Sequence, residues 1–137
     1  MTDPTEIFRI LVVDDDNRLR SELVAALSEE GIDVVGEAVT GADGVALAAA
    51  MFVDVVVMDL RMPNINGIEA ARQIVLQPDP PEIVLLSAYD DPALRAAAAE
   101  VGVFDYVVKG CRIEFLTGMV YAAARHARAR RHLRATS

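Results

Sequence analysis

Short runs of apolar, mostly β-branched residues alternate along the chain with longer segments whose apolar residues recur at helical spacing. Unbroken β-branched runs are typical of strands buried on both faces. The predicted strands are 7–13 (IFRILVV), 32–38 (IDVVGEA), 53–58 (VDVVVM), 82–87 (EIVLLS) and 103–108 (VFDYVV). The predicted helices are 14–31, 41–51, 65–77, 90–102 and a last one from about 112.

Strand and helix alternate five times, which predicts a parallel sheet with helices on both faces. Right-handed crossovers make this an α/β, doubly wound, five-stranded sheet in a three-layer (βα)5 sandwich. The flavodoxin-like strand order 2-1-3-4-5 is the arrangement we expect. A chain of 137 residues with 53% hydrophobic and 25% charged residues is consistent with one globular domain.

The net charge of −8 is distributed unevenly. All 21 acidic residues precede position 122, and five arginines follow it, at 125, 128, 130, 131 and 134. An acidic body is a poor non-specific binder of nucleic acid. At about 100° per residue the five arginines are interpreted as scattered around the helix, so we expect residues 122–137 to project from the domain rather than pack on it.

Polar residues follow four of the five predicted strands. The first strand ends in Asp14 and Asp15, the third in Asp59, the fourth in Ser87 and the fifth in Lys109. Ligands of open α/β sheets bind beyond the carboxyl ends of the strands. In the order 2-1-3-4-5 these four strands are neighbours, so we expect their terminal side chains to share one edge.

Clustered carboxylates repel one another unless a cation joins them, and oxygen ligands with room for water suit Mg²⁺. An ammonium and a hydroxyl opposite them suit an anionic oxygen group. Lys109 is the only lysine among 13 basic residues, which indicates a site that needs a compact ammonium. A carboxylate between a metal ion and a lysine is an arrangement for forming an aspartyl phosphate.

The chain resembles the receiver domain of two-component response regulators, which has a CheY-like fold. The resemblance rests on four stretches in the same order and position: ILVVDDD, VVVMDLRMPNING, IVLLSAYDD and FDYVVKG. Their sequences are most similar to the LuxR/NarL-like branch. The resemblance covers residues 7–121. It implies that a histidine kinase or phosphotransfer protein phosphorylates Asp59, and that Mg²⁺, with Mn²⁺ as a substitute, binds Asp14, Asp15, Asp59 and the backbone carbonyl of Arg61. It further implies that Ser87 and Lys109 hold phosphoryl oxygens and that Tyr106 turns inward when Ser87 moves.

Two features depart from the family pattern. Gly110 stands where the family usually has proline after the lysine, so we expect a trans bond between Lys109 and Gly110. Arg61 and Tyr89 flank the expected pocket mouth and are predicted to control access of water to the phosphate. Some residues have plainer interpretations: Asp16 as a helix cap, and Cys111 as a packing residue.

Other functions remain open at this point. A haloacid-dehalogenase-like hydrolase also uses a strand-end aspartate and Mg²⁺, but its second acid would stand at Arg61. A flavodoxin-like FMN carrier needs a Ser/Thr/Gly phosphate loop where this chain has DDDNR. A receiver fold that is never phosphorylated, and acts only by binding, is the third alternative.

The expected organisation is a lead at 1–6, a receiver at 7–121, and a basic segment at 122–137 that is a helical linker to an absent output domain, an arm that contacts a second copy, or a solvated end. The resemblance predicts a regulator rather than a turnover enzyme, with a homodimer through the helix 4–strand 5–helix 5 face, and DNA contact only through an output domain. The single cysteine and the absence of a signal peptide or of an apolar run of about 20 residues predict a cytoplasmic location without membrane contact.

Overall fold

The computed structural model describes residues 7–136. The predicted N-terminal lead, 1–6, lies outside the described residues. The elements alternate as predicted: β1 (Arg9–Val13), α1 (Asn17–Glu29), β2 (Asp33–Ala38), α2 (Gly41–Ala50), β3 (Val55–Asp59), α3 (Gly67–Val75), β4 (Glu82–Ser87), α4 (Pro92–Val101), β5 (Asp105–Val108) and α5 (Ile113–Thr136).

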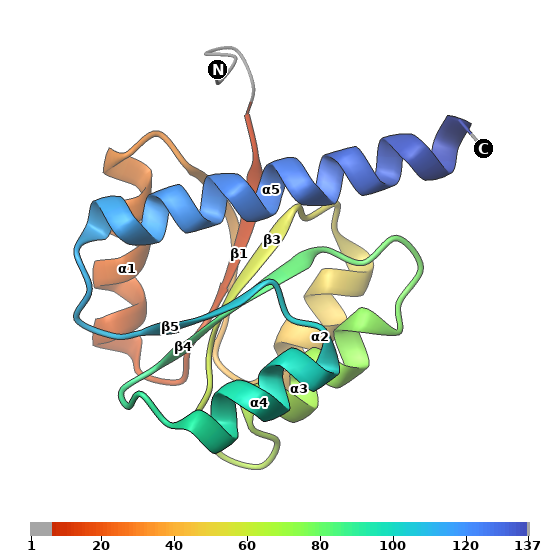
Figure 1. The fold of residues 1–137 in the computed structure, drawn as a ribbon. Helices are drawn as coiled ribbons and strands as arrows, with labels where there is room; N and C mark the ends of the chain where they lie inside the picture. The colour runs from red at the N-terminus through yellow and green to blue at the C-terminus, as the bar shows by residue number, and fades with distance from the viewer. Residues whose placement is uncertain (1–6, 137) are drawn as a thin grey trace.

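The five strands form one parallel sheet in the predicted order β2-β1-β3-β4-β5. Figure 1 shows α1 and α5 on one side of this sheet and α2, α3 and α4 on the other. The two faces bury separate apolar clusters, one with α2, α3 and α4 and one with α1 and α5. The doubly wound three-layer sandwich is therefore confirmed.

Helix starts follow the local sequence signals. Asp16 accepts hydrogen bonds from the backbone amides of Arg18 and Leu19, which makes it the N-cap of α1. Thr40 caps α2 through the amide of Asp43, and Pro92 occupies the first turn of α4. Asp16 and Thr40 thus place the starts of α1 and α2 within a few residues of the ends of β1 and β2.

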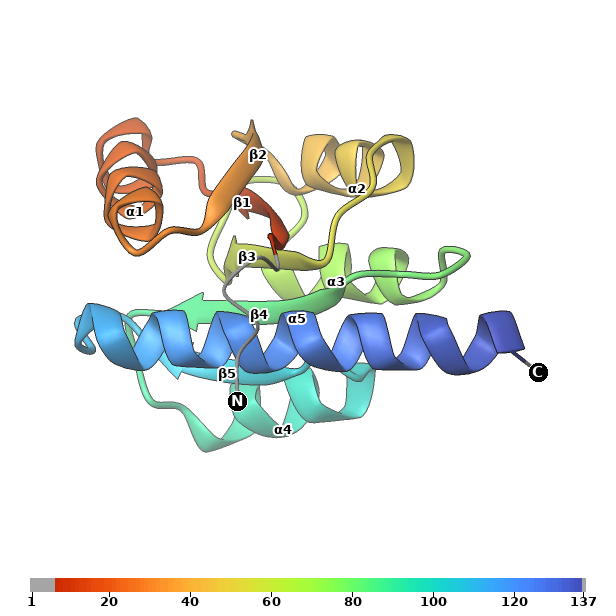
Figure 2. The ribbon, with the colours of Figure 1, turned by 90° about the horizontal axis from the view of Figure 1, so that it is seen from above.

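The last helix differs from the sequence-based interpretation. α5 runs without a break for 24 residues, along the whole length of the sheet (Figure 2). Ala123, Ala124 and Ala127 are fully buried, although they lie in the segment expected to project. The prediction that the arginine segment does not pack on its own domain is therefore wrong.

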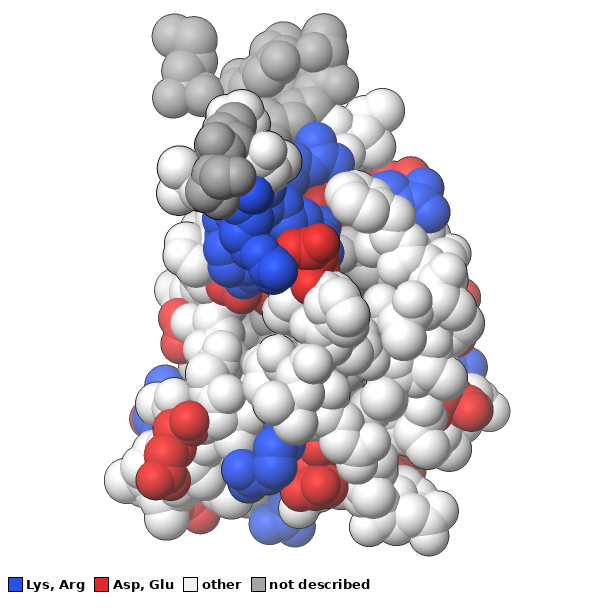
Figure 3. Space-filling view, turned by 90° about the vertical axis from the view of Figure 1, so that its right-hand side faces the viewer, with Lys and Arg blue, Asp and Glu red and all other residues white. Residues whose placement is uncertain are grey.

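The physical reason is a set of acidic residues at the starts of β3 and β4. Asp54 is 0% exposed and pairs with Arg128 at 3.1 Å and Arg131 at 3.2 Å. Glu82 pairs with Arg130 at 2.5 Å, and its other oxygen lies 2.7 Å from His126 Nδ1. Figure 3 shows basic side chains beside acidic ones near the C-terminal end of α5.

The position of these arginines on the helix explains how they reach the acids. With a turn of about 100° per residue, the three buried alanines lie within one arc of about 100° on the helix surface. Arg131 and Arg134 fall within this arc, and Arg128 and Arg130 lie at its borders. Burial lowers the pKa of Arg131 below its ordinary value, and the Asp54 carboxylate opposes that change. The arginines that pair with Asp54 and Glu82 thus lie on or beside a buried alanine face.

Candidate functional site

β3 places Asp59 at the centre of the carboxyl edge of the sheet. All five residues of this strand are buried, and it lies between β1 and β4, where Asp59 pairs in register with Leu86. The chain then turns sharply, because Gly67 brings the start of α3 against the carbonyl of Asp59. A Cβ at Gly67 would lie 2.6 Å from that carbonyl oxygen, so the glycine is required by the close approach.

The loop after β1 presents two further carboxylates at this edge. Asp14 is buried and accepts a hydrogen bond from the amide of Asp16, whereas Asp15 is exposed. Arg20 of α1 donates to the backbone carbonyl of Asp14 at 2.8 Å and also pairs with Glu37. Sequence reasoning missed Arg20, since nothing in the helical pattern distinguishes it from a solvent-facing arginine.

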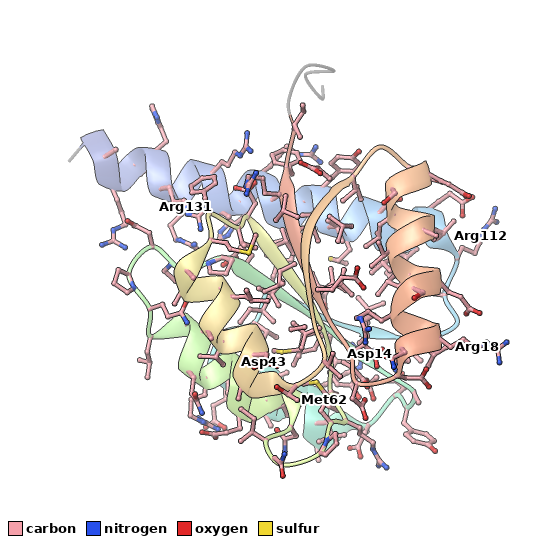
Figure 4. The ribbon with its side chains drawn as sticks, turned by 180° about the vertical axis from the view of Figure 1, so that it is seen from behind. Asp14, Arg18, Asp43, Met62, Arg112 and Arg131 are labelled. Carbon is pink, nitrogen blue, oxygen red and sulfur yellow. The ribbon has the colours of Figure 1, made fainter. Side chains whose placement is uncertain are left out.

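The three carboxylates converge, and the single lysine meets them. One oxygen from each of Asp14, Asp15 and Asp59 lies within 4.8 Å of the others. Lys109 Nζ lies 3.0 Å from Asp59 Oδ1 and 3.8 Å from Asp14 Oδ2. Figure 4 shows Asp14 and Arg131 near opposite ends of the sheet, so the site and the α5 ion pairs lie at opposite ends of the strands.

The charge balance of the cluster favours a cation. Burial raises the pKa of Asp14 above its ordinary value, and the Asp59 and Asp15 carboxylates raise it further, against the Asp16 amide and the Lys109 ammonium. One ammonium thus faces three carboxylates whose mutual repulsion it does not fully relieve. Oxygen donors at this spacing fit Mg²⁺, which would neutralise the charge of a bound phosphoryl group.

The other predicted site residues lie around the same carboxyl edge of the sheet: Arg61, Ser87, Tyr89 and Tyr106. Ser87 is buried at the end of β4, and its hydroxyl accepts a hydrogen bond from the amide of Tyr89 at 3.2 Å. The guanidinium of Arg61 lies 5.2 Å from the centre of the Tyr89 ring, so the two predicted access residues meet. Tyr106 is buried, with its hydroxyl donating to the carbonyl of Tyr89.

The segment after Lys109 agrees with one expectation and departs from another. No cis peptide bond occurs among residues 7–136, so the bond from Lys109 to Gly110 is trans as predicted. Gly110 has a φ of 90°, a left-handed conformation that favours glycine. Cys111 is exposed, so its interpretation as a packing residue is wrong. It borders a groove of about 280 Å³ that also reaches Asp14 and Lys109.

Comparison with known proteins supports the interpretation of this geometry. The profile described as "Response regulator receiver domain" matches residues 10–121. The chain belongs to the response regulator receiver family. Receivers act in two-component signalling as phosphoacceptor regulators rather than as turnover enzymes. The hydrolase and FMN-carrier alternatives are therefore set aside.

The relatives include transcriptional regulators, and LiaR among them agrees with the LuxR/NarL-like branch. The chain is 33% identical over 120 residues to the transcriptional regulatory protein LiaR of Bacillus subtilis, covering 87% of this chain and 57% of LiaR. It is 39% identical over 101 residues to the transcriptional regulatory protein PdtaR of Mycobacterium tuberculosis, covering 74% of this chain and 49% of PdtaR. This receiver thus spans about half the length of the curated relatives it matches.

Solved structures show the same fold. The signal receiver domain of the putative response regulator NarL from Mycobacterium tuberculosis superposes with a TM-score of 0.82 at 32% identity, covering 88% of this chain and 98% of that one.

Within residues 7–136 no helix is both long enough and apolar enough to cross a bilayer.

Proposed function

We propose that this receiver is a phosphorylation switch in which Asp59 accepts a phosphoryl group from a kinase phosphohistidine. The observation that carries the proposal is the approach of Lys109 Nζ to within 3.0 Å of Asp59 beside the carboxylate cluster. An Asp59 oxygen would attack phosphorus and form a new O–P bond. The N–P bond to the histidine would break, and its electron pair would stay on a ring already protonated at the other nitrogen, which leaves as neutral imidazole.

The neighbouring residues have distinct parts in this proposal. Asp14, Asp15, Asp59 and the carbonyl of Arg61 would hold Mg²⁺, with Mn²⁺ as a substitute. Ser87 and Lys109 would bind the phosphoryl oxygens, because a hydroxyl and an ammonium complement their charge. The stacked side chains of Arg61 and Tyr89 would cover the mouth and limit entry of water, which would slow hydrolysis of the aspartyl phosphate.

The output is proposed to act through the face formed by α4, β5 and α5, where Tyr106 lies. Movement of Ser87 toward the phosphoryl group would alter this face and control a homodimer or another partner. The half-length match to transcriptional regulators supports α5 as the connector to an output domain that binds DNA. In this scheme residues 122–137 link the domains while their first turns pack on the receiver.

Phosphoryl uptake tests the proposal directly. Incubation with acetyl phosphate and Mg²⁺ should add one phosphoryl group per chain by intact mass, with acetate as the leaving group. EDTA should prevent the addition, and Asp59→Asn should remove it. Asp43→Asn, at an exposed aspartate in the first turn of α2, is the matched control and should be phosphorylated like the parent. Equal uptake by Asp59→Asn would refute the assignment, and no uptake by the parent would favour a receiver that acts only by binding.

The second prediction concerns the single lysine. Lys109→Arg should keep the fold and the positive charge yet lose most of the conformational response, because a planar guanidinium cannot occupy the position of the compact ammonium beside Asp59. NMR spectra of the amides, recorded with and without phosphorylation, measure that response. If the variant shows the same phosphorylation-induced shifts as the parent, the special role of the ammonium is disproved.

A further inference from the structure

Tyr106 is held in its buried position by contacts on two sides. Its side chain is only 5% exposed, and its hydroxyl donates to the carbonyl of Tyr89 at 2.6 Å. On its other side the guanidinium of Arg95 lies 4.8 Å from the ring centre. Tyr89 lies in the loop between β4 and α4, and Arg95 lies in α4. Neither is among the residues proposed to hold the phosphoryl group.

Arg95 connects this ring to the loop that follows Ser87. Its Nε donates to Asp90 at 2.6 Å, and its Nη1 donates to the backbone carbonyl of Tyr106 at 3.2 Å. Asp90 lies three residues after Ser87 in the same loop. One planar guanidinium therefore bridges the loop and β5 with two hydrogen bonds and a ring contact, which a shorter or non-planar cation could not do together.

The space beside the ring indicates that packing alone does not fix it. A cavity of about 240 Å³ lies next to Tyr106 between α4 and β5, lined by Arg95, Ala98, Ala99, Val103, Phe104, Asp105 and Tyr106 itself. Tyr106 therefore borders open space, although it also belongs to the buried cluster on this face of the sheet. Besides that packing, the ring and its hydroxyl are in contact with the Arg95 guanidinium and the Tyr89 carbonyl.

We propose that Arg95 is a positioning residue that holds Tyr106 buried and ties its position to the loop carrying Ser87 and Asp90. The inference rests on the proposed function, in which Ser87 and Tyr106 form the switch, and it adds the residue that links them. Because these contacts do not involve Asp59 or Lys109, we expect them to hold Tyr106 buried whether or not Asp59 carries a phosphoryl group. Phosphorylation then acts on a ring that Arg95 has already placed.

The test is the solvent accessibility of Tyr106 in protein labelled with 3-fluorotyrosine. The chain has three tyrosines, and Tyr→Phe variants assign their ¹⁹F signals. Relaxation by a soluble gadolinium chelate should leave Tyr106 protected and Tyr89, which is 59% exposed, strongly affected. In Arg95→Met without metal or phosphoryl group, the fraction of molecules with Tyr106 exposed should be about fivefold that of the parent. The rise is expected because the variant loses a cation–π contact and a hydrogen bond.

Further variants separate positioning from general destabilisation. Arg95→Lys keeps a cation near the ring without the double hydrogen bond and should restore protection in part. Asp90→Asn should give an intermediate exposure, since it weakens the anchor of the guanidinium. Arg72→Met, which removes an exposed arginine of α3 paired with Glu69, is the matched control and should leave Tyr106 protected. Full protection of Tyr106 in Arg95→Met would overturn the proposal.

Mg²⁺ with beryllofluoride, a phosphoryl mimic, distinguishes this inference from the proposed function. It should return Tyr106 of Arg95→Met toward the protected signal and change the parent signal little. If it shifts no tyrosine signal and no amide near Asp59 in either protein, the phosphorylation switch fails, whereas the metal-free comparison still decides the role of Arg95. If it fails to restore protection in Arg95→Met while the amides near Asp59 shift, the link between loop and ring is disproved.

Discussion

Asp54→Ala should lower the free energy of unfolding by roughly 3 kcal/mol, although Asp54 is remote from the phosphoacceptor edge. The fully buried carboxylate pairs with Arg128 and Arg131 and accepts a hydrogen bond from the amide of Arg9 at 2.8 Å. Its removal leaves Arg131, whose side chain is mostly buried, without this compensating charge. We expect this loss of stability to be at the lower end of the range caused by breaking buried ion pairs, because the Arg128 side chain can still reach water.

Urea unfolding followed by circular dichroism measures this loss, and the melting temperature should fall by about 10 °C for a domain of this size. Asp54→Asn should recover part of the stability, since its amide oxygen can still accept from Arg9. Asp33→Ala, at an exposed position that starts β2, is the control and should change stability by less than about 0.5 kcal/mol. Equal stability of Asp54→Ala and the parent would show that the ion pairs contribute nothing net.

Truncation after Ala122 should destabilise the receiver still more, by roughly 5 kcal/mol. It removes three buried alanines, whose burial contributes about 0.8 kcal/mol for each methyl group. It also leaves Asp54 and Glu82 without their arginine partners, and uncompensated buried charge is the larger penalty. Stability of this order is a large fraction of the total for a single domain.

A second truncation, after His132, provides the matched comparison. It keeps Arg128, Arg130 and Arg131 and removes the pair between Arg134 and Asp79, whose side chains are both well exposed. Exposed ion pairs contribute little, so this variant should remain within about 1 kcal/mol of the parent. If the chain ending at residue 122 melted at the parental temperature, the helix extension would be independent of the domain after all.

The order of elements and the position of the carboxylates could be predicted because both depend on local patterns. Apolar β-branched runs define the strands, and the carboxyl ends of parallel strands meet at one edge of the sheet. The proximity of Asp14, Asp59 and Lys109 therefore follows from the sequence alone. Helix caps such as Asp16 were equally readable, since a capping side chain bonds to amides two or three residues ahead.

The contacts of α5 could not be predicted in this way. Arg128 and Asp54 are 74 residues apart, and Arg130 and Glu82 are 48 apart, so no local spacing indicates that they pair. The alanines that the sheet buries, Ala123, Ala124 and Ala127, are too small to mark an apolar stripe in the sequence. Arg95 was missed for a related reason: its partners lie in a loop and on β5, and an arginine on an alanine-rich helix looks solvent-facing.

The unbroken α5 also has a mechanical consequence. Its first turn follows the lysine loop, and its ion pairs near Arg128 fix it against the far end of the sheet. With a rise of 1.5 Å per residue, about 22 Å of helix precede Arg128 and about 12 Å follow it to Thr136. A rod pivoting on Asp54 would carry a displacement at Ile113 to Thr136 at about half the size and in the opposite direction.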